Sequence, residues 1–400
     1  MEVEQGRANI NRLSITIGIA CFLWMLNFLG ITPFYPFMAE DLDTSVALLG
    51  QITALIAIIS IPIGIITGPV ADRFGYRKVL LSGIFTLSIG SLIVAFSPTY
   101  KFLLMLVPFG AISQATVRPL SIAIAGAHLA QEDRRRAVGL ATVGMSTAGV
   151  FGIPVLTLIG SFWGWRMSFL CLTGLNAMLT IFLVRSIPRD REGVESIESP
   201  PLNPRAYAWM LTDVATVLLI ASTFLRESSI WGFYTFRGAF FVETFRVGSQ
   251  HIGWIFSIAG IGLLAGSAIA GSHRFRLPLS MIALLGITIM TLCCTLTLVL
   301  SLGLVLAVAL TMITAFGLGF AMVATDTMIV NLAKGGRATT TSLNRAAANI
   351  GTSIGGVSGG LMLSLGGYRL LGVSVFLFGI AAFLFVLFSS FLRGRRKAGK

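Results

Sequence analysis

The feature that most limits how this chain can fold is a series of long, uninterrupted apolar segments. Each approaches the ~20 apolar residues that a helix needs to cross the hydrocarbon core of a bilayer. Because apolar residues run continuously and do not alternate with polar ones, the segments favour helices over a β-barrel. The sequence therefore predicts an all-α membrane protein with twelve transmembrane helices. They are expected at 13–34, 48–70, 79–97, 102–127, 137–160, 167–185, 209–238, 250–271, 277–300, 303–329, 339–365 and 370–392.

Composition excludes a soluble protein. Of the 400 residues, 55% are hydrophobic and only 11% are charged, whereas a soluble domain carries about 25% charged residues. A water-exposed surface could not be built from so few charges, so the solvent for most of this chain is lipid.

The net charge of +13 does not indicate nucleic-acid binding, because the basic residues are spread between the apolar segments. With a cytoplasmic amino terminus, most of the 29 Lys and Arg fall on the cytoplasmic side, as the positive-inside rule requires. Both termini are therefore predicted to be cytoplasmic, and the basic tail at 393–400 is expected to contact anionic lipid. The exceptions are Lys101, Arg166, Arg246 and Arg369 in external loops, and Arg118, Arg226, Arg237 and Arg345 inside predicted helices.

Neither a metal centre nor an enzyme is indicated. The cysteines lie in apolar segments without metal-ligand spacing and the three histidines form no cluster, so no metal or cofactor is expected. No Ser-His-Asp set and no phosphate-binding loop is apparent, which argues against an enzyme and against ATP-driven transport. The four cysteines are Cys21, Cys171, Cys293 and Cys294.

A polar, proline-rich segment at 186–208 interrupts the apolar pattern. It is interpreted as a cytoplasmic linker between two six-helix halves, 1–185 and 209–400. The halves echo each other at an offset near 203 residues, which suggests duplication and two parallel repeats. The matches include Glu40 with Glu243, Gly50 with Gly253, Arg73 with Arg276, and Gly164-Trp165-Arg166 with Gly367-Tyr368-Arg369.

The most specific local motif joins the second and third predicted helices and reads GPVADRFGYRK over residues 68–78. Gly75 permits a tight turn, and the acid at Asp72 can face helix amino termini and cationic side chains. The second-half copy keeps Gly271 and Arg276, but Phe275 stands where the first half has its acid. The motif residues singled out as a conformational latch are Gly68, Asp72, Arg73, Gly75, Arg77 and Lys78.

With this loop, the linker and the repeat, the chain resembles the major facilitator superfamily along its whole length. The resemblance implies a fold of two pseudo-symmetric six-helix bundles, and a charge network at Asp72 and Arg73 that latches the cytoplasmic side in one state. Within the family the chain looks most like twelve-helix drug and metabolite proton antiporters. The features are the Pro33-Phe34-Tyr35-Pro36 exit from the first helix and a glycine-rich fifth helix with Gly139, Gly144, Gly149, Gly152 and Pro154.

Ionisable groups inside the membrane are functional candidates, because each costs at least ~2.5–3.5 kcal/mol to insert. Glu227 and Asp326 are the acids at depth, while Asp213 is expected at the solvated start of the seventh helix. One hypothesis is that Arg118 and Asp326 face each other across the transport path, pairing in one state and separating in another. Such a cycle suits proton coupling, and a position of Asp326 in the cytoplasmic vestibule is the alternative.

The remaining charges leave more than one interpretation open. Arg226 and Glu227 are adjacent but point about 100° apart on a helix, so they need not pair, and a structural contact is as plausible as a functional one. Arg345 opens a polar stripe with Asn344 and Asn349. Arg237 is a candidate to extend towards the outer interface.

Two functions are therefore expected to compete. The first is proton-coupled efflux of amphipathic small molecules by alternating access, and the second is transport of organic or inorganic anions held by intramembrane arginines. A membrane enzyme or a receptor is the third, less supported class. The protein is expected to be a monomer that binds a small-molecule substrate and a coupling ion. Besides the charges, the substrate site is expected to include Asn27, Phe34, Gln114, Trp231 and Tyr234.

Overall fold

The computed structural model describes residues 2–128, 140–141, 143–187, 213–271, 277–300, 303–332 and 337–398. Most of the predicted linker lies outside these ranges, as do Gly139, Phe275 and Arg276, and the side chain of Asp72 is also not described.

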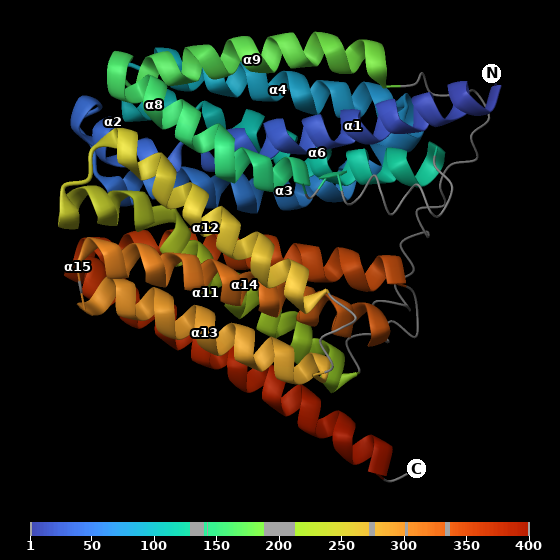
Figure 1. Cartoon of the computed structure of the whole chain (residues 1–400), viewed down its shortest axis with the longest axis vertical. Helices are drawn as coiled ribbons and strands as arrows, with labels where there is room; N and C mark the ends of the chain where they lie inside the picture. Colours follow the sequence, from blue (N-terminus) through green and yellow to red (C-terminus); the bar gives the residue numbers. More distant parts are fainter. Residues whose placement is uncertain are drawn as a thin grey trace. The chain divides into compact units, whose positions relative to one another are not determined.

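The described part of the chain is helical and contains no strand. Figure 1 labels most of the helices and colours them in chain order. Those of the first part are α1 (Glu2–Leu29), η1 (Thr32–Phe34), α2 (Tyr35–Asp41), α3 (Val46–Phe74), α4 (Tyr76–Phe96), α5 (Tyr100–Leu103), α6 (Leu106–His128), η2 (Ala148–Gly152), α8 (Ile153–Trp163) and α9 (Trp165–Ser186). They are followed by α11 (Val214–Phe245), α12 (Ser249–Ala270), α13 (Leu279–Leu300), α14 (Leu304–Leu332) and α15 (Arg337–Ala398).

Two compact units are formed. The first comprises Met1–Ser45, Leu55–Ser199 and Gly248–Ser257, and the second comprises Val46–Ala54, Pro200–Val247 and Ile258–Lys400. Helices α3 and α12 are thus each divided between the units. The simple division into halves at a 186–208 linker stays a prediction.

Twelve membrane crossings follow from these helices. Among the described residues, 11 helices are long and apolar enough to span a bilayer. One of them is α15, whose 62 residues would reach roughly 90 Å at 1.5 Å per residue, about three times the hydrocarbon thickness. Its helical geometry is broken at Gly366 and Gly367, which separates two crossings. The predicted all-α, twelve-helix architecture is confirmed.

Prolines move the exit of the first crossing from its predicted place. The apolar run continues to Phe34, but α1 ends at Leu29. The short elements η1 and α2 follow, each with a proline in its first turn. Proline lacks an N–H and suits the first turn of a helix, where that donor has no partner anyway. The chain therefore restarts its helix twice before Asp41.

Proline also shapes the fifth crossing. The five residues of η2 form a π-helical stretch directly before α8, an insertion that the apolar pattern does not predict. Pro154 follows and has no N–H to donate to the carbonyl of Val150. That carbonyl instead accepts a hydrogen bond of 2.5 Å from Ser257 Oγ of α12, in the same unit.

The two repeated glycine turns adopt the same construction. Gly164 and Gly367 both have positive φ, at 81° and 66°, which only glycine adopts readily. In each turn the aromatic residue after the glycine donates a hydrogen bond to an acid near the carboxyl end of a helix in the same unit, α2 or α11. Trp165 Nε1 donates to Asp41 Oδ2 at 3.0 Å, and Tyr368 Oη donates to Glu243 Oε2 at 2.9 Å. The structures of the two turns therefore support the duplication that the sequence suggests.

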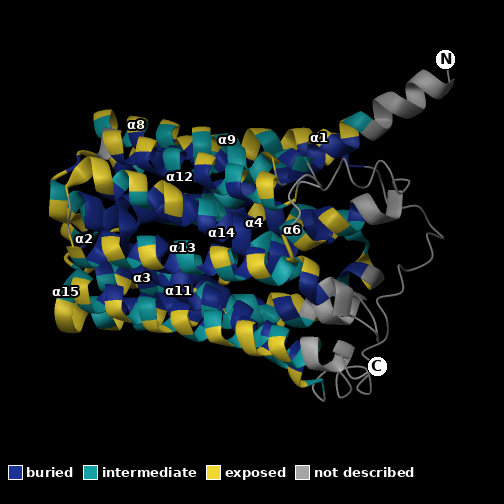
Figure 2. Cartoon of the chain, turned by 60° about the horizontal axis from the view of Figure 1, so that its bottom comes forward, coloured by how far each residue is buried: buried dark blue, intermediate teal, exposed yellow. Residues whose placement is uncertain are grey.

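The distribution of burial fits a lipid environment. Large apolar side chains are exposed along many helices, among them Phe162, Trp163 and Val305. Figure 2 shows such exposed residues along the length of helices such as α13 and α15. Each unit has its own apolar core, around Leu23 and Val117 in the first and around Ile287 and Phe320 in the second.

Candidate functional site

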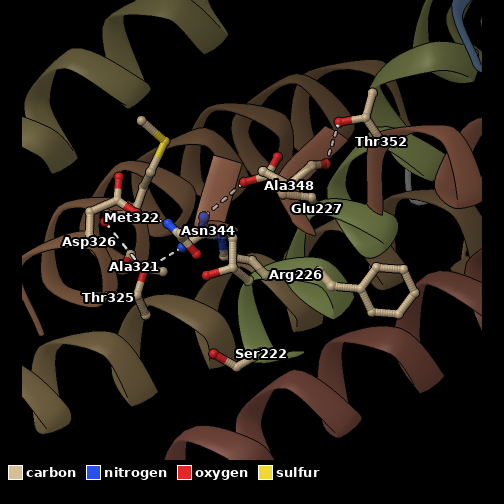
Figure 3. A network of polar contacts seen from close by, with 12 residues as sticks. Ser222, Arg226, Glu227, Ala321, Met322, Thr325, Asp326, Asn344, Ala348 and Thr352 are labelled. Carbon is tan, nitrogen blue, oxygen red and sulfur yellow. Dashed lines mark hydrogen bonds and ion pairs between the residues drawn. The ribbon is translucent and has the colours of Figure 1, made fainter. Parts of the chain in front are cut away.

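The second unit contains a buried polar network that joins three helices (Figure 3). At its centre Arg226 Nη2 donates to Glu227 Oε1 at 2.8 Å, and the two side chains are only 2% and 13% exposed. The adjacent residues do pair, because their long side chains bridge the angle between them. Arg226 also donates to the hydroxyl of Thr325 on α14. The other Glu227 oxygen, Oε2, accepts from Trp231 Nε1 at 3.0 Å.

Asp326, next to Thr325, has a different partner. Its Oδ1 accepts a hydrogen bond of 3.1 Å from Asn344 Nδ2 on α15. Among the described residues no other hydrogen bond or ion pair to Asp326 is found. The side chain is half-buried. The two carboxylates of the network therefore differ, since Glu227 binds a cation and Asp326 binds a neutral amide.

Close helix packing fixes where these side chains lie. Gly351 and Gly355 of α15 leave no room for a side chain, because an added Cβ would meet the backbone carbonyls of Phe224 and Ser228 on α11. Small residues allow membrane helices to approach in this way. A Cβ added at Gly351 would also meet the Cβ of Glu227. Helix α15 therefore covers the ion pair at this position.

Further along α11, aromatic and basic side chains stack. Trp231 and Tyr234 lie edge to face with ring centroids 6.0 Å apart. The guanidinium of Arg237 lies 4.2 Å from the centre of the Tyr234 ring. Arg237 is 3% exposed, so the expectation that it extends to the outer interface is wrong. The Tyr234 ring covers one face of the guanidinium inside the unit.

In the first unit, Asn27 belongs to a hydrogen-bond network between helices. Asn27 of α1 and Asn176 of α9 exchange two hydrogen bonds of 3.0 Å. Asn176 also donates to Ser91 Oγ of α4 at 3.1 Å. Asn176 is fully buried, so this network ties three helices together. Phe34, another expected lining residue, is also buried and packs edge to face on Phe169.

Arg118 and Gln114 lie one turn apart on α6, in the first unit. The Arg118 guanidinium is 5.8 Å from the centre of the Trp24 ring on α1, which is a cation–π contact. Gln114 Oε1 is buried without a donor among the described residues. Arg118 and Asp326 belong to different units, and their pairing stays a prediction.

The loop motif at 68–78 is a turn between α3 and α4. Gly75 directly precedes α4 and has a φ of 95°, a backbone angle that glycine adopts readily. Arg77 donates to the carbonyl of Val184 near the end of α9 at 2.5 Å. A cation is favourable at the carboxyl end of a helix. Arg73 and Lys78 are exposed, and Gly68 lies inside α3. The latch role of these residues stays a prediction.

Sequence reasoning therefore found the charged members of the network and missed how they are joined. Thr325 was not singled out, and Asn344 was noted only as part of a stripe with Arg345, which is exposed. Trp24 and Asn176 were also missed. A lone amide in an apolar segment, as at Asn176, is the signal that could have been used.

The chain belongs to the Major Facilitator Superfamily, whose sequence profile matches residues 15–248 and 219–400. Among its relatives, the uncharacterized MFS-type transporter YceJ of Bacillus subtilis (strain 168) is 22% identical over 394 residues, which cover 98% of each chain. A chloramphenicol resistance protein of Streptomyces lividans is 23% identical over 63% of this chain and 64% of its own. A probable sugar efflux transporter of Mannheimia succiniciproducens is 25% identical over 60% of this chain and 57% of its own.

Solved structures show the same fold. A bacterial homolog of the human lysosomal transporter Spinster superposes with a TM-score of 0.76 at 16% identity, over 94% of this chain and 96% of the other. The nucleoside transporter NupG, in a mutant form, gives a TM-score of 0.76 at 16% identity over 94% and 99%. The protein is thus a multi-pass membrane protein of a transporter family, and this family and fold are not those of enzymes.

Proposed function

We propose that this protein is a proton-coupled exporter of amphipathic small molecules that works by alternating access, with Asp326 as the proton carrier. The supporting observation is the contrast between two membrane-embedded carboxylates. Both oxygens of Glu227 are occupied by donors, one of them a guanidinium, and charge-assisted hydrogen bonds are the strong ones. Asp326 has one neutral donor, so it is the acid that can gain and lose a proton without breaking an ion pair.

A proton suits this place better than a sodium ion. A hard cation needs about six oxygen ligands, whereas an N–H of Asn344 faces Asp326 Oδ1 and the Arg226 guanidinium binds the neighbouring Thr325. Among the described residues no group of three or more His, Cys, Asp or Glu side chains could hold a metal ion.

Outward transport is supported by the relatives. One is named for chloramphenicol resistance and another for sugar efflux. The bias of basic residues supports a place in the cytoplasmic membrane with both termini in the cytoplasm. In this proposal the protein acts as a monomer, and its substrates are small molecules with an apolar body.

The proposal is tested by accumulation of a lipophilic fluorescent dye in inverted membrane vesicles under an imposed pH gradient. Wild-type vesicles should accumulate dye and Asp326→Asn vesicles should not. Asp213→Asn is the matched control, because Asp213 caps α11 by accepting from the N–H of Thr216 at 3.2 Å, and Asn caps helices as well as Asp does. Gradient-driven accumulation that persists in Asp326→Asn would contradict the proposal.

Anion transport is the second candidate, favoured by the position of Arg118. Its guanidinium lies over the Trp24 ring of α1, inside the first unit. Arg forks suit carboxylate and phosphate. A thermal-shift screen with small carboxylates and phosphates distinguishes the two, since a ligand at 100 times its Kd stabilises by about 2.7 kcal/mol. Stabilisation by an anion that is lost in Arg118→Gln would favour this candidate.

A further inference from the structure

We propose that Asn344 reports the protonation state of Asp326 to α15, by donating to the ionised carboxylate and accepting from the protonated one. This inference rests on the proposed role of Asp326 as the proton carrier. It concerns a residue on another helix that touches the carrier and carries no charge itself.

The geometry that carries the inference is the arrangement of the Asn344 amide. Its Nδ2 donates to Asp326 Oδ1 at 3.1 Å. Its Oδ1 is buried and has no donor among the described residues. The whole residue is 9% exposed, and Figure 3 shows the amide beside Asp326. The acceptor of the amide is therefore unused at a site where a buried polar atom without a partner is costly.

A half-turn about the terminal side-chain bond exchanges the amide nitrogen and oxygen. When Asp326 takes up one proton on a carboxylate oxygen, it becomes an O–H donor. The rotated amide then accepts that proton's hydrogen bond through Oδ1, and the N–H···O bond is replaced by an O–H···O bond. Because Oδ1 has no other partner, the rotation breaks no further bond. Both states of Asp326 thus keep one hydrogen bond between α14 and α15.

The other ionisable groups near this pair have fixed roles or lie apart from it. On α11, Arg226 and Glu227 form their own ion pair. On α15, Arg345 follows Asn344 in the chain and is exposed. Among the described residues, α12 and α13 also pack on α14. Their titratable groups are His251, at the beginning of α12, and the cysteine pair Cys293-Cys294 on α13.

The consequence is that the hydrogen bond between Asp326 and Asn344 reverses its direction and is not lost. A salt bridge would break when its acid became neutral, whereas this amide holds α15 in both states and only reverses. Since α15 covers the Arg226–Glu227 pair through Gly351, a reversal at Asn344 acts on the helix that closes the network. A leucine at position 344 would fill the same space but could neither donate a hydrogen bond to Asp326 nor accept one from it.

The pH profile of dye transport in proteoliposomes tests the inference. Asn344→Leu should move the half-maximal pH upwards by about one unit. The reason is that hydrogen bonds to a charged group are roughly twice as strong as neutral ones, so losing the amide penalises the ionised form more. Asn349→Leu is the matched control on the same helix and should leave the profile in place. An Asn344→Leu profile that superimposes on wild type overturns the inference.

Failure of the inference can be separated from failure of the proposed function. If Asp326→Asn abolishes coupling while Asn344→Leu leaves the pH profile unchanged, only the role of Asn344 is wrong. If coupling survives in Asp326→Asn, the proposed carrier is wrong and the inference falls with it.

A second measurement needs no Asn344 variant and applies even if Asn344→Leu does not fold. Infrared difference spectra are recorded between acid and alkaline pH on protein labelled with ¹⁵N in its asparagine side-chain amides. An amide band that changes with pH in wild type and is constant in Asp326→Ala supports the inference. The same pH-dependent change in both proteins overturns it.

Discussion

At the residue scale, the pair on α11 shows how a charge is tolerated inside a membrane protein. Arg226 is 2% exposed and Glu227 13%, and each lies mid-helix, where an isolated charge is expensive. The cost is offset by the ion pair and by the donors and acceptors around it at Thr325 and Trp231. Removing one partner leaves a buried charge without compensation, which typically costs about 3–5 kcal/mol.

We therefore expect Glu227→Gln to lower the thermal stability of the purified protein by an amount of that order, about 3–5 kcal/mol. The double variant Arg226→Met/Glu227→Gln should recover part of the loss, because no unpaired charge remains. Thermal unfolding in detergent measures both. Equal melting temperatures for Glu227→Gln and wild type would mean that the pair does not stabilise the fold.

How far single residues of the site could be predicted depends on their chemistry. Glu227 and Asp326 stand out because a carboxylate in an apolar segment is rare and expensive. The neutral members of the network do not, since polar uncharged side chains such as those of Thr325 and Asn344 occur throughout membrane helices. Which of them meets a charged group on another helix depends on the rotation of one helix against another, and no spacing within a single segment encodes that.

At the element scale, close approach of α11 and α15 depends on glycine. An added Cβ at Gly355 would meet the backbone of Ser228 and lie 3.0 Å from the Gly232 nitrogen, so the helices would have to separate. Gly355→Ala should cost about 1–3 kcal/mol of stability, as overpacking does. Gly174→Ala on α9 is the control, because a Cβ there meets nothing within 4 Å and alanine favours helix.

Thermal unfolding of the two variants in the same detergent checks this expectation. The predicted order is Gly355→Ala below wild type, with Gly174→Ala at or above it. If both variants unfold at the wild-type temperature, the packing of α11 on α15 is looser than the structure has it.

The elements themselves were largely predictable, and the exceptions have identifiable causes. Long apolar runs mark the crossings because lipid leaves the backbone no other partner than itself. Breaks inside a run are not marked in this way, since they change the backbone and leave composition unchanged. The π-helical stretch before Pro154 and the restart after Leu29 are of this kind. The break at Gly366 and Gly367 was anticipated because its glycine–aromatic–arginine turn repeats that at Gly164.

At the scale of the whole molecule, the charge bias predicts which side each loop faces. Lys78 in the first turn of α4 and Lys101 beyond its other end are both exposed. With 21 residues, α4 is about 32 Å long. In a variant without the four native cysteines, Lys101→Cys should react with a membrane-impermeant maleimide on intact cells. Lys78→Cys should react only after permeabilisation. Labelling of both from outside would contradict the predicted orientation.

The architecture of the molecule was predictable because duplication and the 68–78 motif add to what hydropathy gives. The function was predictable only as a class. Substrate choice depends on which side chains converge on the transported molecule, and the direction of transport and the coupling ion depend on how the molecule changes between states. The hydrophobic pattern of a single segment predicts none of these properties.

The most direct test of the central claim, that Asp326 carries the coupling proton, compares two modes of transport in one preparation. Proteoliposomes with wild-type protein or Asp326→Asn are assayed for dye accumulation driven by a pH gradient, and for exchange of labelled against unlabelled dye without a gradient. The prediction is that Asp326→Asn loses gradient-driven accumulation and keeps exchange. Accumulation at the wild-type level in Asp326→Asn would contradict the account.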